Sequence, residues 1–243
     1  MFDTKKLLDQ FMGAGGLGDV SRGDTLARGQ DLLRSNTGGL AGGALAGGLA
    51  GLLLGTKSGR KIGKKALTYG GMALVAGLAY KAYRDWQDNK SAQPQPGNTP
   101  ARHDTPVLPP PSDSPFAPER TPGGQQRFAL TLLTAMIAAA KADGHIDQTE
   151  RARIFDKMEE AGLGAEERAF IDNELAKPLD IERVVSGATT MEQAVEIYAA
   201  SRLAIDPDHP AERGYLAMLA ARLELDPALV AEVDRAVVEA AET

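Results

Sequence analysis

Two acidic turns hold the residues of this chain that are best suited to chemistry. In the first turn, residues 143–150 carry three carboxylates, Asp143, Asp147 and Glu150. The order Asp, Gly, an apolar residue and a final Glu matches the second half of a calcium-binding helix–loop–helix motif. The positions of the leading ligands hold an alanine and Lys141, so this turn alone is not expected to hold calcium tightly. The alternative is an ordinary turn in which Asp147 and Glu150 cap a helix.

The second acidic turn supplies three more carboxylates, Asp206, Asp208 and Glu212. If a helical bundle brings both turns to one end, six carboxylates meet with no basic residue inside either cluster. Their mutual repulsion would favour a bound cation. Hard oxygen ligands indicate calcium, magnesium or manganese, whereas a zinc site would need His145 and His209, which we expect to be exposed.

The charge of the chain is divided between its two ends. Residues 1–90 carry a net charge of +6 and residues 125–243 a net charge of −11, within a total of −6. A basic first part suits anionic lipid headgroups, and an acidic remainder argues against a nucleic-acid partner. The chain has no cysteine, which excludes disulfides, thiol catalysis and cysteine metal sites.

Residues 38–55 form an uncharged stretch made of glycine, leucine and alanine. Its glycines recur every four residues, so on a helix they form a smooth groove that favours close helix approach in lipid. The alternative is a flexible linker, although linkers usually contain serine and other polar residues. We therefore predict a membrane helix that self-associates through Gly39, Gly43, Gly47, Gly51 and Gly55.

A second apolar segment, residues 66–83, follows a basic turn at residues 57–65. Tyr80, Tyr83 and Trp86 gather at its end, as aromatic residues do at a membrane interface. Its glycines could face the first segment, which predicts a helical hairpin, with a single span as the alternative. Basic loops stay cytoplasmic, so the hairpin places the N-terminus and the acidic domain in the periplasm.

Composition divides the chain into four parts. Residues 1–37 are predicted to be a tail with a short amphipathic start, residues 38–90 the membrane region and residues 91–124 a disordered linker that holds ten of the fourteen prolines. From residue 125 the apolar residues follow helical spacing, with start and stop signals for seven helices. The predicted fold is therefore all-α, ending in a helical bundle at residues 125–243.

A resemblance to a known family adds to this interpretation. The runs ADGHID at residues 142–147 and ERGYLAMLA at residues 212–220 resemble the C-terminal domain of YebE-type bacterial inner-membrane proteins, which is similar to the tellurite-resistance TerB domain. The resemblance extends over almost the whole chain. It implies a bundle of seven to eight helices and an acidic metal site, matched here by Asp143, Glu150, Asp206 and Glu212.

Carboxylates are the concentrated chemistry of the chain, and this predicts binding rather than catalysis. We expect a bacterial inner-membrane protein, not an enzyme, whose acidic domain binds a divalent cation, an unidentified protein partner or both, with a role in envelope stress response. One alternative is a purely structural oligomer assembled through the glycine ladder. Another is a metal-dependent hydrolase, which would also need a basic group near the developing charge.

Overall fold

The computed structural model describes Thr4, Leu8 and residues 71–91, 107–144, 165–205 and 207–242. All regular secondary structure in these residues is helical, which confirms the all-α prediction for them. The elements are α6 (Gly71–Ser91), the 3-10 helix η2 (Pro118–Arg120), α7 (Gln125–Ala140), α9 (Ala165–Ala176), α10 (Ile181–Val185), α11 (Met191–Ala204), α12 (Pro210–Arg222) and α13 (Pro227–Glu242).

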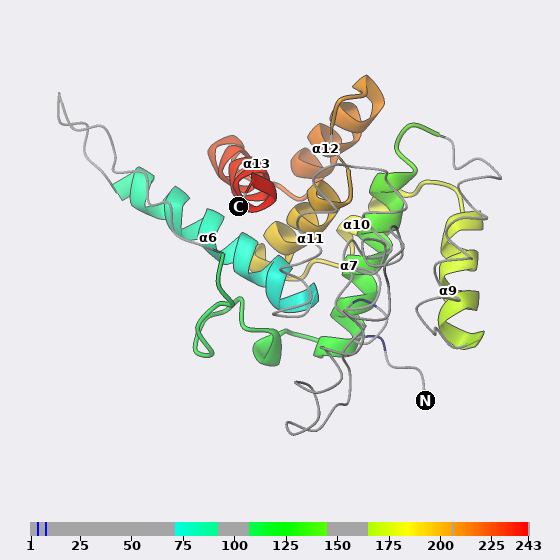
Figure 1. Cartoon of the computed structure of the whole chain (residues 1–243), viewed down its shortest axis with the longest axis horizontal. Helices are drawn as coiled ribbons and strands as arrows, with labels where there is room; N and C mark the ends of the chain where they lie inside the picture. The colour runs from blue at the N-terminus through cyan, green and yellow to red at the C-terminus, as the bar shows by residue number, and fades with distance from the viewer. Residues whose placement is uncertain are drawn as a thin grey trace, which may run out of the picture.

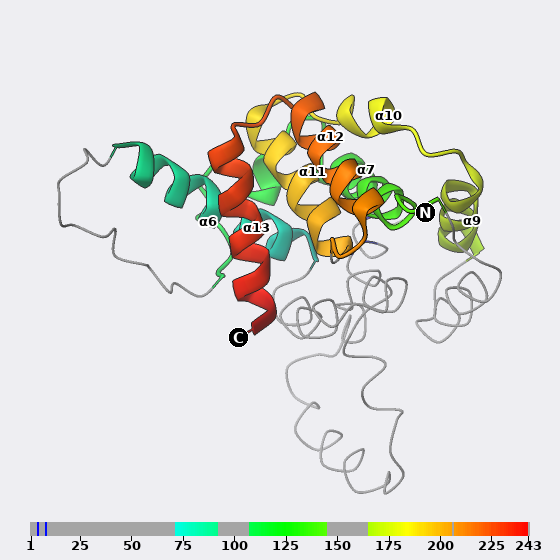
Figure 2. The same cartoon turned by 90° about the horizontal axis from the view of Figure 1, so that it is seen from above.

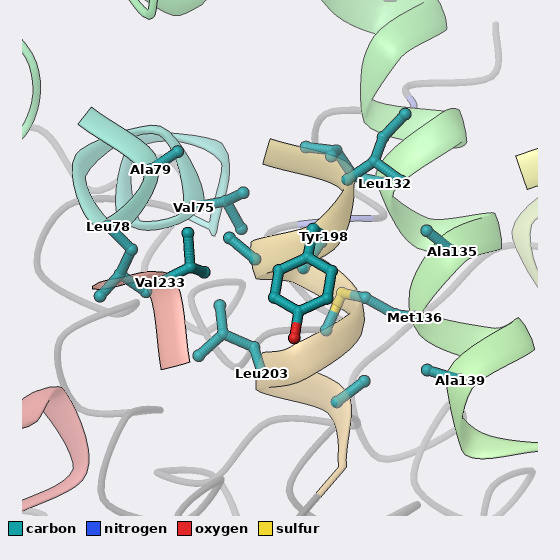
Figure 3. Close-up of a cluster of buried hydrophobic side chains, with 14 of the residues drawn as sticks. Val75, Leu78, Ala79, Leu132, Ala135, Met136, Ala139, Tyr198, Leu203 and Val233 are labelled. Carbon is teal, nitrogen blue, oxygen red and sulfur yellow. The ribbon is translucent and has the colours of Figure 1, made fainter. Parts of the chain in front are cut away.

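Helix α11 is the centre of the bundle. Every residue from Gln193 to Ala204 is buried. Helix α7 packs along one side of α11, whereas α6 and α13 pack together along another (Figures 1 and 2). Tyr198 lies among side chains from α6, α7 and α13 (Figure 3). Small residues such as Ala199 and Ala200 let these neighbours approach the helix from several directions.

Local sequence signals account for several of the helix ends. Helix α9 ends just before Pro178, which cannot continue a helix. Helix α13 begins at Pro227, where Asp226 Oδ1 accepts a hydrogen bond from the backbone N–H of Ala228. At α11, Thr190 is the N-cap, and its side chain accepts a hydrogen bond from the backbone N–H of Gln193.

Helix α6 is a core element, and this corrects the interpretation of residues 66–83 as a membrane segment. Its apolar side, which includes Leu74, Val75 and Leu78, joins the same hydrophobic core as α11 and α13. Gly77 was expected to face a membrane helix. Instead, a Cβ atom at Gly77 would lie 2.5 Å from the backbone oxygen of Leu108. The glycine therefore allows the chain at residues 107–108 to cross close to α6.

The aromatic residues at the end of α6 pack against the proline-rich segment rather than forming a membrane belt. The ring centroid of Phe116 lies 6.0 Å from that of Tyr80 and 5.4 Å from that of Tyr83, and Phe116 is buried. Ser114 accepts a hydrogen bond from the backbone N–H of Phe116. Residues 107–124, placed in the disordered linker by the sequence, are thus ordered against the bundle.

No helix in the described ranges is both long enough and apolar enough to cross a lipid bilayer. Helix α6 carries Lys81, Arg84 and Asp85 in its second half, which interrupts its apolar surface. The glycine ladder of residues 38–55 lies outside the described residues. The prediction of a membrane helix there stays a prediction.

The start of the chain is attached to the bundle, which differs from the predicted tail. Thr4 and Leu8 are both helical and buried. Leu8 is fully buried within the hydrophobic core, and Thr4 Oγ1 donates a 2.7 Å hydrogen bond to the backbone oxygen of Gln126 in the first turn of α7.

Candidate functional site

The first predicted acidic turn begins just after α7. Asp143 is exposed there, whereas Asp147 and Glu150 lie outside the described residues. The preceding Lys141 turns toward the end of α9, where its Nζ donates to the backbone oxygens of Glu174 and Lys177. Burial lowers the pKa of Lys141, against the opposing effect of the Glu174 carboxylate. A basic side chain two residues from Asp143 therefore serves as a cap for α9.

The second acidic turn is used as a helix start. His209 is the N-cap of α12, and its Nδ1 accepts from the N–H of Ala211. Glu212 reaches back to accept from the backbone N–H of His209, which completes a capping box. Arg213 Nη1 donates to the backbone oxygens of Pro207 and Asp208, at 3.1 and 2.7 Å. The turn is thus contacted by a guanidinium from Arg213, the residue that directly follows the predicted cluster.

The six-carboxylate site stays a prediction. In the described part of the chain, no group of three or more His, Asp or Glu residues could hold a metal ion. Asp206, like the two carboxylates of the first turn, lies outside that part. The three predicted carboxylates that the structure describes do not share one role. Asp143 and Asp208 are exposed, whereas Glu212 takes part in the cap of α12.

A buried ionic cluster, missed in the sequence, lies where α9 meets α10. Glu174 is only 3% exposed, and its carboxylate accepts from Arg183 at 2.5 and 3.0 Å and from Lys177 at 2.6 Å. Burial would raise the pKa of Glu174, but the hydrogen bonds from Arg183 and Lys177 outweigh burial and lower it. This cluster holds the short helix α10 against α9. In the sequence, the only indication of this cluster is that Glu174 and Lys177 are three residues apart.

A second buried carboxyl group lies on α11, and its pKa is shifted in the opposite direction. Glu196 is 6% exposed. Burial, with a smaller contribution from the charge of Glu192 one turn earlier, raises the pKa of Glu196 to about 8. The side chain is therefore largely protonated near neutral pH. The sequence placed Glu196 on a helix but gave no sign that all sides of this helix are covered.

Two other polar side chains of α11, Gln193 and Arg202, make contacts outside the helix. Gln193 accepts from Thr189 and donates to the backbone oxygen of Pro122 at 3.1 Å. Arg202 donates to the backbone oxygen of Ile205 at 2.7 Å, and its Nε lies 3.4 Å from Asp234 Oδ1 on α13. These contacts fix the position of α11 along its neighbours. Such contacts compensate the cost of burying polar groups.

A charged seam joins α6 to α13. Lys81 Nζ lies 3.1 Å from Asp85 Oδ2 and 3.0 Å from Glu239 Oε2, while Arg235 contacts Asp85 and Glu232. Burial alone would lower the pKa of Lys81, but its hydrogen bonds to Glu239 and Asp85 outweigh burial and raise it. The seam fixes the charged half of α6 to α13, just as apolar packing fixes the other half.

The two flanks of residues 9–70 meet on one body. Leu8 and the start of α6, represented by Met72 and Leu74, belong to one hydrophobic core. The glycine ladder and the basic turn at residues 57–65 both fall between these flanks. Helical spacing of Leu8 with neighbouring apolar residues was the only signal in the sequence that the first residues could dock. The burial of Leu8 and of the start of α6 in one core is the observation on which the functional proposal rests.

Comparison with known proteins gives two matches. The sequence profile described as "Protein of unknown function (DUF533)" matches residues 39–237, which include the glycine ladder and most of the bundle. A protein of Yersinia enterocolitica, described as "Uncharacterized protein in ampR 5'region", is 36% identical over 94 residues, which are 39% of this chain and 68% of the relative. No solved structure matches.

Proposed function

This chain belongs to the DUF533 family of proteins of unknown function, and we propose that it is a non-enzymatic, membrane-associated binding protein. In this proposal, residues 38–65 contact the lipid and the acidic helical body presents a surface to a protein partner. One observation carries the proposal. The bundle buries Leu8 on one side of the apolar and basic segments and α6 on the other. The residues that flank the proposed lipid-binding segment on either side are therefore both attached to the body.

The composition of the held segment supports lipid as its partner. Residues 38–55 have no charge, and Lys57, Arg60, Lys61, Lys64 and Lys65 follow them closely. Each basic side chain near an anionic bilayer contributes about 1 kcal/mol to binding. Apolar insertion and this attraction together give the two signals that stable membrane attachment requires. The bacterial inner membrane, which contains anionic lipids, is the proposed location.

The contacts of the body weaken the case for a bound cation. Arg213 places a guanidinium beside the second acidic turn, which reduces the repulsion that a cation would relieve. The ion pairs of Glu174 and Lys81 join helices, as structural groups do. Binding of calcium, magnesium or manganese is a further proposal, tested by whether these ions raise the melting temperature of the full chain.

Flotation with lipid vesicles tests the proposed membrane association. Purified full-length protein should float with vesicles of phosphatidylethanolamine and phosphatidylglycerol. The double variant Leu52→Asp, Leu53→Asp should remain at the bottom of the gradient, because it places two charges in the apolar stretch. The matched control is Leu179→Asp, which changes a leucine that is 42% exposed on the body and should float like the wild type.

Two results would contradict the proposal. If the wild-type chain does not float, residues 38–65 do not bind lipid. If all three proteins float equally, another surface is responsible for membrane binding. Circular dichroism of each variant establishes that the helical body has folded before flotation is compared.

A further inference from the structure

One side of α6 is covered by residues 107–117, which we call the strap. Gly77, Tyr80 and Tyr83 follow one another three residues apart on α6, so they lie on one side of the helix. We call this side the aromatic face of α6. The backbone of the strap passes close to Gly77, and the ring of Phe116 packs against the rings of both tyrosines. The aromatic face is thus occupied by a segment of the same chain that is rich in proline.

Burial along the strap has the period of an extended proline-rich ligand. Val107 and Pro110 are buried, whereas Leu108 and Pro109 between them are exposed. A spacing of three residues is one turn of a polyproline II helix, the form in which proline-rich segments dock into aromatic-lined grooves. Phe116, which is 2% exposed, adds a buried aromatic ring after the prolines. The aromatic face therefore receives one side of a proline-containing segment, and the other side stays open to solvent.

The strap attaches to α6 through buried side chains, and its internal hydrogen bonds are local turns. The backbone N–H of Ser114 donates to the oxygen of Pro111, and the N–H of Ala117 donates to the oxygen of Ser114. Helix α6 also packs against α11 and α13, so the strap is one of several elements that hold it. A segment attached by a few buried side chains can be replaced by another segment that presents the same side chains.

We propose that the aromatic face of α6 is a docking site for a proline-rich segment of a partner protein, and that the strap occupies this site when the partner is absent. The proposal rests on the proposed function, because it names the class of protein that the body binds. The expected partner segment presents an apolar residue, a proline three positions later and then an aromatic ring, as the strap does.

A second copy of this chain is a less favourable source of that segment. Each copy already docks its own strap on its own α6, and exchange between copies would form the same contacts again. Association would still cost translational and rotational freedom. A segment of a separate protein has no such competing site on its own body, so its binding gains new contacts.

Peptide binding by full-length variants tests the docking site. The double variant Val107→Asp, Phe116→Asp should release the strap, because docking would bury both new charges. The matched control Leu108→Asp, Ser112→Asp places the same charges at exposed positions, so its strap should stay docked. The probe is a fluorescein-labelled peptide, VLPPPSDSPFA, identical to residues 107–117. Fluorescence anisotropy should show at least about tenfold tighter binding to the released variant, because the attached strap competes with the peptide in the control.

Two further changes test whether the peptide occupies the aromatic face. Adding Gly77→Leu to the released variant should abolish binding, because a Cβ atom at Gly77 would lie 2.5 Å from the backbone oxygen of Leu108. A peptide whose phenylalanine is replaced by alanine should bind at least about tenfold more weakly. Trp86 is the single tryptophan of the chain, and its ring centroid lies 5.5 Å from that of Tyr83. Its fluorescence should change when the strap is released and return when the peptide binds.

The outcomes separate an exchangeable strap from a permanent part of the core. Failure of the labelled peptide to bind the released variant would overturn the proposal, as would binding that survives Gly77→Leu. Loss of helical circular dichroism in the released variant, or continued protection of residues 107–117 from hydrogen exchange, would show that the strap is a permanent part of the core.

Light scattering tests the other source of the segment. A wild-type dimer that dissociates in the released variant would assign the docking site to a second copy and overturn its assignment to a partner protein. The peptide assay contains no lipid. Its failure therefore leaves the proposed membrane association standing, and failed flotation with vesicles leaves the docking site standing.

Discussion

Two buried glutamates of the bundle, Glu174 and Glu196, have nearly the same exposure and opposite properties. Glu174 is 3% exposed and Glu196 is 6% exposed. The pKa of Glu174 is lowered because Arg183 and Lys177 donate hydrogen bonds to its carboxylate. The pKa of Glu196 is raised to about 8 by burial. In the folded protein at neutral pH, the Glu174 side chain is therefore ionised and the Glu196 side chain is largely protonated.

The difference shows that burial alone does not decide the charge of a carboxyl group. Removing an ion from water costs several kcal/mol, and paired basic groups compensate that cost. Where α10 supplies Arg183, Glu174 can remain ionised. On α11, burial and, to a smaller extent, the negative charge of Glu192 raise the pKa of Glu196, so this side chain retains its proton. The pH dependence of stability should therefore have opposite signs at the two sites.

The largest expected effect is that of pH on Glu196. Its folded pKa of about 8 lies above the ordinary value of 4.5, so the folded state binds the proton more tightly than the unfolded state. The stability contributed by neutral Glu196 is complete below pH 4.5 and is lost as the pH rises through 8. Glu196→Gln should be more stable than the wild type above pH 8, by up to about 5 kcal/mol, and nearly equal to it in mild acid.

Denaturant unfolding of both proteins across this pH range measures the effect. The matched control is Glu182→Gln, because Glu182 is an exposed glutamate whose side chain is 58% accessible. This control should follow the wild-type pH profile. Parallel stability curves for Glu196→Gln and the wild type would show that Glu196 is ionised in the folded protein.

The second prediction removes the partner of Glu174. Arg183→Ala leaves a buried carboxylate with less compensation, which should lower the free energy of unfolding at neutral pH by about 2 kcal/mol after allowance for the partial exposure of Arg183. The control Arg222→Ala breaks an exposed pair with Glu182 and should cost about 0.5 kcal/mol or less. Because the folded pKa of Glu174 is lowered, the difference should disappear in acid, where the carboxylate becomes protonated.

Equal losses for Arg183→Ala and Arg222→Ala would contradict this account. Chemical denaturation of both variants at neutral pH makes the comparison. Repeating the measurement in acid shows whether the loss in Arg183→Ala depends on the ionised form of Glu174.

The smallest expected effect concerns the neighbour of Glu196. Glu192→Gln removes a like charge one helical turn away, which should lower the pKa of Glu196 and stabilise the bundle near neutral pH by a few tenths of a kcal/mol. The midpoint of the pH-dependent loss of stability should move to lower pH. If that midpoint does not move, burial alone sets the pKa of Glu196.

Helix positions were largely predictable because their signals are local. Helix α9 ends just before Pro178 and Thr190 caps the start of α11, so both boundaries follow from local sequence signals. The candidate site was less predictable. Arg213 folds back onto the second acidic turn, and Lys141 reaches the last carbonyl oxygens of α9. These contacts depend on side-chain direction and on helix packing, which spacing along the chain does not define.

The sequence by itself determined an all-helical chain with an acidic body, because helical periodicity, caps and net charge are properties of local segments. Only the tertiary structure decided the role of α6, whose apolar composition is compatible with either lipid or a protein core. The decision comes from α11 and α13, which cover its apolar side. Tertiary packing likewise decided that Glu174 is ionised and Glu196 is largely protonated, because the charge of a buried carboxyl group depends on the groups that surround it in space.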